Sequence, residues 1–340
     1  MRRTIFATLA VAGAVVVTAT PAGAWDYPGH RVVGMIADIV LQRDHPVAYQ
    51  RVSELLEQKF GPVVDKRTLG EVAVFPDCAK NEPQYCGRKA STEEVEYVLR
   101  NVVHKSFHFV NNPVQQKTYV AGTVGTVETD VVQMIDHTVI QLRGKTPYRK
   151  QDVKLTNTEA LWLLAHLVGD IHQPLHIGQR YYDATCETPI DPSASTSAEA
   201  ISTFGGNFIY LSNLPNTNLH YYWDGVAIAN VMKEEGVTDE AAFAQKLAAA
   251  PPTNWETPGP LASWPESWVA EAIKYATEAH DKLTIKKKDL EPRQFPRPSV
   301  RCTWTTEVDA QYETWAKGVA REQLHKAGYR LAATLKAIFE

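Results

Sequence analysis

Apolar residues recur three and four positions apart in most long segments of this chain, which is the spacing of one face of an α-helix. This spacing predicts helices over residues 30–41, 46–60, 126–143, 217–233, 238–250, 264–283 and 306–338. Capping-box patterns at Ser91 to Glu94 and Thr156 to Glu159 predict two further helix starts. No strand-rich region, internal repeat or interdomain linker stands out. We therefore expect one all-α, mainly helical domain.

Two segments interrupt the helical pattern. Residues 183–206 are rich in Ser, Thr, Pro and Gly, and we interpret them as an inserted surface loop. Residues 284–303 contain Pro292, Pro296 and Pro298, so we expect irregular structure there.

Bulk charge limits the ways in which the protein can bind an anion. The formal net charge is −4 at pH 7, which does not support a basic nucleic-acid-binding surface. An anionic substrate would have to be held by local charges or by metal ions.

The first 24 residues have the organisation of a cleaved signal peptide. Arg2 and Arg3 precede an apolar Ala/Val-rich stretch, and Ala22 to Ala24 is a small-residue cleavage site. A membrane anchor is the weaker interpretation because the apolar run is short. We expect export to the periplasm or the medium, a mature chain that begins at Trp25, and a single domain over residues 25–340.

Four cysteines in an exported protein predict two disulfides, for which three pairings are possible. We favour Cys78–Cys86, which closes a short loop, and by elimination Cys186–Cys302. A cysteine zinc site is disfavoured because the chain contains no C-x-x-C pair.

The eleven histidines include two that lie four residues before an aspartate. His166 and Asp170, like His220 and Asp224, would share one helix face, and zinc accepts both ligand types. Pro174 should end or bend the helix after Asp170 and let His176 approach a neighbouring site. A single such pair is typical of a salt bridge, whereas two pairs and a flanking histidine indicate a metal site.

Five separated segments carry a resemblance to a known family. They are WDYPGH at 25–30, HLVGDIHQPLH at 166–176, GGN at 205–207, NLHYYWD at 218–224 and AGYRLAATL at 327–335. Together they make the chain similar to the zinc-dependent single-strand nucleases typified by the fungal nucleases S-one and P-one. The short leader and the absence of an N-x-S/T sequon indicate a secreted bacterial member.

The resemblance implies three zinc ions. The first would be bound by Asp77, His108, His166 and Asp170. The second would share Asp170 and take His30 with the α-amino nitrogen and carbonyl oxygen of Trp25, which requires cleavage after Ala24. The third would be bound by His176, His220 and Asp224.

The resemblance also implies a mechanism in which a hydroxide generated between the two close metals attacks phosphorus and Asp77 orients it. Lys80 is a candidate phosphate clamp, with a solvated surface lysine as the alternative. Phe109 occupies the family's base-stacking position, and Asn111 replaces a carboxylate that some relatives use to read the base edge. We interpret His172, inside the metal-ligand motif, as structural.

The activity implied is hydrolysis of single-stranded DNA and RNA to 5′-nucleotides, with 3′-nucleotidase activity. We expect a monomer without a membrane anchor, and no protein partner is inferred. Two alternatives remain: a zinc-dependent phospholipase C, which we expect to carry a glutamate where this chain has Asp224, and a non-catalytic zinc-binding protein.

Overall fold

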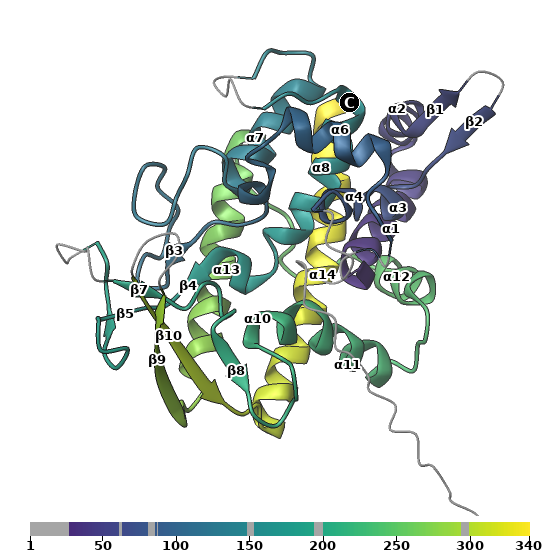
Figure 1. Ribbon diagram of the computed structural model, residues 1–340. Coiled ribbons are helices and arrows are strands. Elements are labelled where there is room, and N and C mark those ends of the chain that lie inside the picture. The colour runs from purple at the N-terminus through teal and green to yellow at the C-terminus, as the bar shows by residue number, and fades with distance from the viewer. Residues whose placement is uncertain are drawn as a thin grey trace, which may run out of the picture.

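The computed structural model describes residues 27–60, 63–80, 86, 88–147, 153–193, 200–293 and 299–340. Helices make up most of this part of the chain (Figure 1). They are α1 Tyr27–Asp44, α2 Pro46–Leu56, α3 Leu69–Val72, α4 Phe75–Cys78, α6 Thr92–Arg100, α7 Val131–Leu142, α8 Asn157–Asp170, α9 Pro174–Ile177, α10 Leu219–Tyr221, α11 Ala227–Glu234, α12 Glu240–Ala248, α13 Trp264–Asp281 and α14 Ala310–Phe339. Shorter turns are the 3₁₀ segments His104–His108 and Leu261–Ser263 and the π segment Tyr222–Val226. The mainly helical fold class is confirmed.

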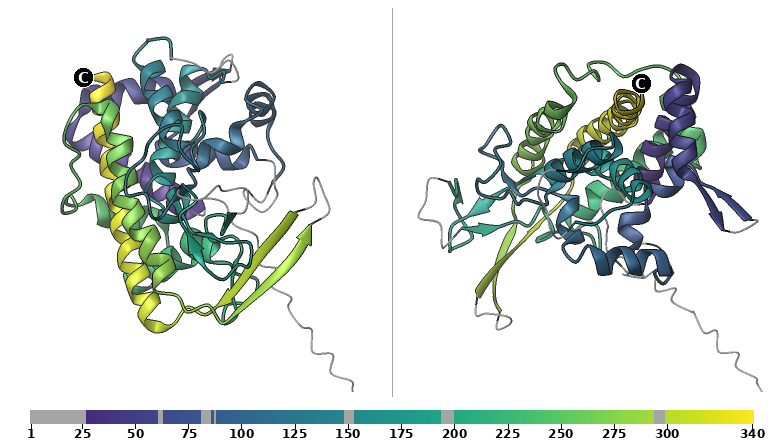
Figure 2. Two further views of the ribbon diagram at one scale, coloured as in Figure 1. Left: turned by 90° about the vertical axis from the view of Figure 1, so that its left-hand side faces the viewer. Right: turned by 90° about the horizontal axis from the view of Figure 1, so that it is seen from above.

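The strands are short and lie at the margins of the helical body. They are β1 Glu57–Phe60, β2 Val63–Lys66, β3 Asn112–Pro113, β4 Gly178–Gln179, β5 Tyr181–Tyr182, β6 Pro189–Ile190, β7 Ile201–Ser202, β8 Ile209–Leu211, β9 Lys287–Arg293 and β10 Ser299–Thr306. They form four small sheets, of which the largest have three strands in the orders β8-β10-β9 and β6-β5-β7. The β1–β2 and β9–β10 hairpins project from the helices (Figure 2).

Local sequence signals placed several helix ends correctly. Ser91 and Glu94 exchange side-chain and backbone hydrogen bonds at the start of α6, as the capping box predicts, and Thr156 and Glu159 do the same at α8. The helices predicted from residues 126 and 306 begin later, at α7 and α14. An aspartate caps each start, since Asp130 and Asp309 accept hydrogen bonds from the third residue beyond.

Three predictions for secondary structure need correction in part. The helix expected over 46–60 ends at Leu56, because residues 57–60 pair with β2 in an antiparallel hairpin. The helix expected over 217–233 is divided into α10, a π turn and α11. Within 284–303, which we expected to be irregular, residues 287–293 form β9 and residues 299–303 belong to β10, which pairs with β8 in parallel.

Tertiary contacts explain why β10 forms despite the prolines nearby. Cys302 and Trp304 are buried, so the strand is held by its packed side chains as well as by its backbone ladder. Cys302 is also bonded to Cys186 in the segment that we expected to be an inserted loop. That segment contributes β6 and β7, while its residues 194–199 lie outside the described part of the chain.

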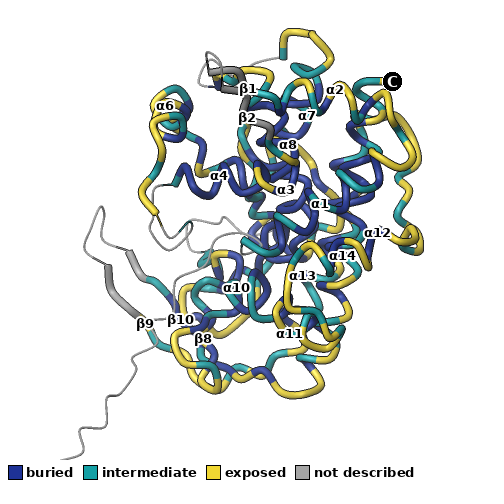
Figure 3. Tube along the Cα trace, turned by 90° about the vertical axis from the view of Figure 1, so that its right-hand side faces the viewer, coloured by how far each residue is buried: buried dark blue, intermediate teal, exposed yellow. Residues whose placement is uncertain are grey.

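The core is organised around α14. This helix runs through the body with α1, α8 and α11 packed against it, and the buried residues concentrate where these helices meet (Figures 1 and 3). Trp162 and Trp268 are fully buried and belong to this core. None of the described helices is both long and apolar enough to cross a membrane.

Two glycines allow α1 to approach its neighbours closely. A Cβ atom at Gly328 of α14 would lie 2.4 Å from Ile36 Cγ2 on α1, and one at Gly34 would lie 2.5 Å from the Leu69 backbone. Such contacts cannot be made without movement of a helix, so these positions fix the separation between α1 and both α14 and α3.

We predict that Gly328→Ala lowers the free energy of unfolding by about 1 to 3 kcal/mol, because the methyl group overpacks the α1–α14 contact. Gly318→Ala on the same helix is the matched control, since a Cβ there meets no heavy atom within 4 Å. It should be neutral or stabilising by up to about 1 kcal/mol through helix propensity. Denaturant unfolding of the two variants measures both effects, and equal effects would contradict the packing argument.

Candidate metal centre

Eight of the nine residues predicted as metal ligands lie in the described part of the chain, and all eight converge on one buried region. Trp25 is not among the described residues. Seven of the eight are buried and His220 is half-buried. The residues and their elements are His30 on α1, Asp77 on α4, His108 in the 3₁₀ turn, His166 and Asp170 on α8, His176 on α9, His220 on α10 and Asp224 in the π turn.

Helix α8 and the turn after it supply the centre of this region. His166 Nε2 lies 3.0 Å from Asp170 Oδ2, as expected for residues one helical turn apart. The helix ends at Asp170, and Pro174 begins α9. His176 Nδ1 is thereby 3.5 Å from Asp170 Oδ1, so the predicted bend does return this histidine to the cluster.

The carboxylate of Asp170 is shared by ring nitrogens from several elements. His108 Nδ1 lies 3.1 Å from Asp170 Oδ2, and His30 Nε2 lies 3.4 Å from Asp170 Oδ1. Asp77 Oδ1 is 3.7 Å from both His108 Nδ1 and His166 Nε2. These contacts connect the described residues of the first two predicted metal sites, which have Asp170 in common.

Among the described residues, three groups of side chains are arranged closely enough to hold a metal ion. In each group the candidate ligand atoms all lie within 4.8 Å of one another. The groups are His30, His166 and Asp170; Asp77, His108 and His166; and His176, His220 and Asp224. The third is the complete set predicted for the third ion, and the other two divide the remaining described ligands with His166 in both.

Backbone carbonyls orient three of the histidines. His166 Nδ1 donates to Ala73 O at 2.6 Å, His176 Nδ1 to His108 O at 2.7 Å, and His220 Nδ1 to Gly205 O at 2.8 Å. Each bond fixes the proton on Nδ1 and leaves Nε2 as the lone-pair nitrogen. Hydrogen bonding of the outer nitrogen in this way is typical of metal-binding histidines.

At His166 burial is outweighed by the carboxylates of Asp170 and Asp77, which raise the pKa, whereas at three other histidines burial dominates. Burial lowers the pKa of His30 to about 4 and the pKa values of His108 and His220 to about 3, so these imidazoles are neutral near pH 7, the form that binds metal. Burial opposes ionisation of Asp170, but His166 and His176 outweigh it and hold the pKa of this carboxyl well below its usual range.

Several buried polar atoms in the cluster are placed to bind a cation. Within the described part of the chain, both ring nitrogens of His30, Asp170 Oδ1 and His176 Nε2 make no hydrogen bond. Leaving buried polar atoms unsatisfied is costly, and a coordinated metal ion would satisfy them. The donor set of imidazole nitrogens and carboxylate oxygens suits zinc.

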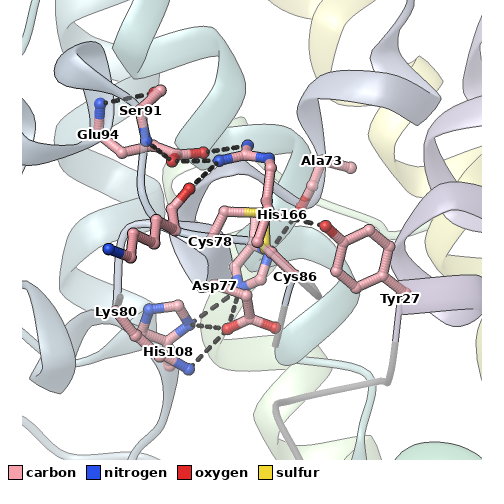
Figure 4. Close-up of a disulfide and its surroundings, with 12 residues drawn as sticks. Tyr27, Ala73, Asp77, Cys78, Lys80, Cys86, Ser91, Glu94, His108 and His166 are labelled. Atoms are coloured by element: carbon pink, nitrogen blue, oxygen red, sulfur yellow. Dashed lines mark hydrogen bonds and ion pairs between the residues drawn. A yellow bond between two sulfur atoms is a disulfide. The ribbon is translucent and has the colours of Figure 1, made fainter. Parts of the chain in front are cut away.

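Asp77 is held between a lysine and a disulfide (Figure 4). Lys80 Nζ donates to Asp77 Oδ1 at 2.6 Å, and burial, which opposes ionisation, is outweighed by Lys80 and the histidines so that the pKa of Asp77 falls below its usual range. The Lys80 side chain is only 12% exposed, which argues against a solvated surface lysine. The next residue, Cys78, is bonded to Cys86, and the predicted pairings Cys78–Cys86 and Cys186–Cys302 are both confirmed.

Two residues next to the ligands, Gln173 and His172, have supporting roles. Gln173 Nε2 donates to Asp224 Oδ1 at 2.6 Å while its Oε1 accepts from Leu175 N at 2.5 Å. Sequence reasoning missed Gln173, although its place between two ligands in DIHQPLH was a signal. His172 donates to Val168 O and accepts from Arg330, so its structural interpretation is confirmed.

The segment after His108 lies against the same region. Val110 N donates to His176 O at 2.8 Å, which places half-buried Phe109 beside the cluster. Asn111 is fixed through its backbone: its N–H donates to Gly125 O, and its carbonyl accepts from Tyr181 Oη at 3.1 Å.

Comparison with known proteins identifies the class of this site. A model of the family described as S1/P1 Nuclease matches residues 25–340, and the chain belongs to this family. Endonuclease 3 of Arabidopsis thaliana is 26% identical over 319 residues, covering 93% of this chain and 89% of the relative. Endonuclease 5 of the same plant is 25% identical over 322 residues, covering 93% and 90%, and Endonuclease 1 is 33% identical over 131 residues, covering 38% and 36%.

Membership of this zinc-dependent family, together with the buried His/Asp groups, makes the protein a nuclease, that is, a hydrolase acting on ester bonds. The relatives named here are plant proteins, so the bacterial source stays a prediction.

The two disulfides should contribute differently to the stability of the fold and to zinc binding. In the chain-entropy account, removing Cys186–Cys302, with a sequence separation of 116, costs about 5 kcal/mol, and removing Cys78–Cys86, with a separation of 8, costs about 2.5 kcal/mol. Because Cys78 adjoins Asp77, we predict that the paired serine variant at 78 and 86 loses more zinc and more activity than the one at 186 and 302, although it loses less stability. Unfolding free energy and bound zinc would be measured in both. If the variant at 186 and 302 lost both more stability and more zinc than the variant at 78 and 86, the prediction would be contradicted.

Proposed function

We propose that this protein is an exported, trinuclear-zinc nuclease that hydrolyses phosphodiester bonds of single-stranded DNA and RNA to 5′-nucleotides and removes the phosphate of 3′-nucleotides. The observation that carries the proposal is the buried Asp170 carboxylate, which lies within 3.5 Å of nitrogens on four histidines. A carboxylate so placed suits a bridge between two metal ions, and a separate His/Asp group lies beside it.

The ligand assignment is the one that the family resemblance implies, and a distance between two of these side chains supports part of it. His166 Nε2 lies 2.8 Å from His108 Nδ1, which favours placing both on the first ion with Asp77 and Asp170. His30 and Asp170 would hold the second ion with the amine and carbonyl of Trp25. His176, His220 and Asp224 would hold the third.

Zinc at these positions would supply Lewis-acid chemistry and lower the pKa of a bound water. The protein's own groups would do the positioning. Asp77 would accept a hydrogen bond from the attacking water and so orient it. Lys80, already paired with Asp77, would place its ammonium group near a phosphoryl oxygen and clamp the substrate.

The preference for single strands would follow from base recognition beside the phosphate. A base stacked on Phe109 must leave its own helix stack, which a single strand permits at low cost. Asn111 would meet the base edge with both a donor and an acceptor, unlike the carboxylate of some relatives.

Export would use residues 1–24, which lie outside the described residues, and removal of this leader would free the amine of Trp25. We also propose that the mature protein acts as a monomer comprising residues 25–340.

Digestion of a single-stranded oligonucleotide by the mature, zinc-loaded protein tests the function. We predict release of 5′-mononucleotides, loss of this activity with a chelator, and its recovery with added zinc. Asp224→Asn should lower both activity and bound zinc, because it weakens one ligand group. An intact oligonucleotide in the presence of bound zinc would contradict the nuclease proposal, and cleavage of phosphatidylcholine by the same sample would establish the phospholipase alternative.

Base selectivity offers a second test. We predict that the wild type cleaves beside purines and pyrimidines at similar rates and that Asn111→Asp introduces a preference, because a carboxylate only accepts hydrogen bonds. Asn157→Asp, at the exposed start of α8, is a control with the same change of charge. Identical cleavage patterns for wild type and Asn111→Asp would show that Asn111 does not read the base.

A further inference from the structure

An exposed aromatic side chain lies next to the third ligand group. Phe204 is 52% exposed, and it precedes Gly205, the residue whose carbonyl accepts the Nδ1 hydrogen bond of His220. His220 belongs to the group completed by His176 and Asp224. Among the exposed large apolar side chains of the described residues, Phe204 is the only phenylalanine, and its ring offers a flat face for stacking beside a ligand group.

The loop around Phe204 holds its backbone in an uncommon conformation. Phe204 has φ +54, in the left-handed region that bulky residues rarely adopt. Its N–H donates to Ser202 Oγ at 2.8 Å, and its carbonyl accepts from both Asn207 N at 3.0 Å and Asn207 Nδ2 at 2.9 Å. Backbone strain of this kind persists where the surroundings enforce it, and such positions concentrate at ligand-contact sites.

The glycine after Phe204 keeps this loop against the metal-ligand region. Gly205 has φ +59, and a Cβ there would lie 2.6 Å from Leu175 O and 3.3 Å from His220 Nδ1. The loop backbone therefore packs directly on the segment that carries His176 and on His220 itself. The position of Phe204 relative to the third group is fixed by these contacts.

Phe204 is one member of a small stacked assembly. Its ring lies 5.4 Å from that of Phe208 with an interplanar angle of 17°, and the guanidinium carbon of Arg301 lies 4.6 Å from the Phe208 ring centroid. The backbone bond from Trp304 N to Phe208 O, 2.9 Å long, attaches this loop to β10, the strand that carries Arg301. We call Phe204, Phe208 and Arg301 the Phe204 platform.

We propose that the Phe204 platform is a second nucleobase-binding subsite, on which one base of a single strand stacks against Phe204 while a backbone phosphate pairs with Arg301. Exposed aromatic rings combined with a cation are the general chemistry of single-strand binding. The platform adjoins the His220 group, whereas Phe109 adjoins His108 of another group. It would therefore take a different nucleotide from the one stacked on Phe109. This inference rests on the proposed nuclease function.

The test compares a substrate with many bases and a substrate with one. For Phe204→Ala we expect KM for single-stranded octathymidylate to rise about 5- to 150-fold, as for loss of one stacked base, with kcat changed less than twofold. KM for thymidine 3′-monophosphate should stay unchanged, because its single base occupies the Phe109 position. Phe204→Trp should retain the wild-type KM on both substrates, and Phe204→Leu, which keeps apolar bulk without a flat ring, should resemble Phe204→Ala.

Two further variants complete the experiment. Arg301→Gln should weaken oligonucleotide binding and reduce the slope of log affinity against log salt by about 1, measured with a phosphorothioate octathymidylate that resists cleavage. Tyr210→Ala is the matched control, because this residue on β8 is 43% exposed but is outside the platform. Its KM should equal that of the wild type.

The outcomes separate this inference from the function on which it rests. Unchanged oligonucleotide KM in Phe204→Ala, with an active wild type, would overturn the platform and leave the nuclease proposal standing. An equal rise in KM for the mononucleotide would also overturn it, because Phe204 would then serve the primary nucleotide. Failure of the wild type to cleave the single strand would refute the proposed function itself.

Discussion

The buried carboxylate of Asp170 is the interaction on which the rest of this structure depends. It is fully buried, yet nitrogens of His30, His108, His166 and His176 approach it from four different elements. A charge so placed is stable only when its partners are held in position, because desolvation of an unpaired carboxylate is far more costly than a lost hydrogen bond. The helices around Asp170 must therefore be arranged with little freedom.

The scaffold provides this rigidity at several distances from the cluster. Close helix contacts at Gly34 and Gly328 set the position of α1, which carries His30. The side chain of Arg330 on α14 is itself held in place, because its guanidinium group donates hydrogen bonds to His172, to Trp255 O and to Glu271. Because His172 lies in the turn between Asp170 and His176, α14 directly supports the segment that carries these two residues.

The metal-ligand region and the surface around it are joined by short backbone contacts. The carbonyls of Ala73, His108 and Gly205 each fix one histidine, so three separate chain segments determine which nitrogen of the imidazole is available. The loop that carries Gly205 also reaches the protein surface, because its neighbouring residue Phe204 is exposed to solvent. A single loop can thus orient a histidine and form the surface next to it.

Much of the fold and the candidate site followed from local patterns. The spacing of four between His166 and Asp170, the bend at Pro174 and the two capping boxes require only helix geometry, and each appears as expected. The pairing of Cys78 with Cys86 also follows from their short separation. These features depend on residues close in the chain, whose relation is fixed once the helix or turn forms.

The remaining features were decided by contacts between distant residues. The β9–β10 hairpin forms in a proline-rich segment because Cys302 and Trp304 are buried against other parts of the chain, which no local propensity expresses. The roles of Gln173, Ala73 O and Gly205 O arise only when separate segments meet. The sequence alone determined which side chains are available for metal binding and how they are spaced along each helix. Apart from the grouping that the family resemblance implies, only the tertiary structure decided which of them share a site, because burial and hydrogen bonding act across the fold rather than along the chain.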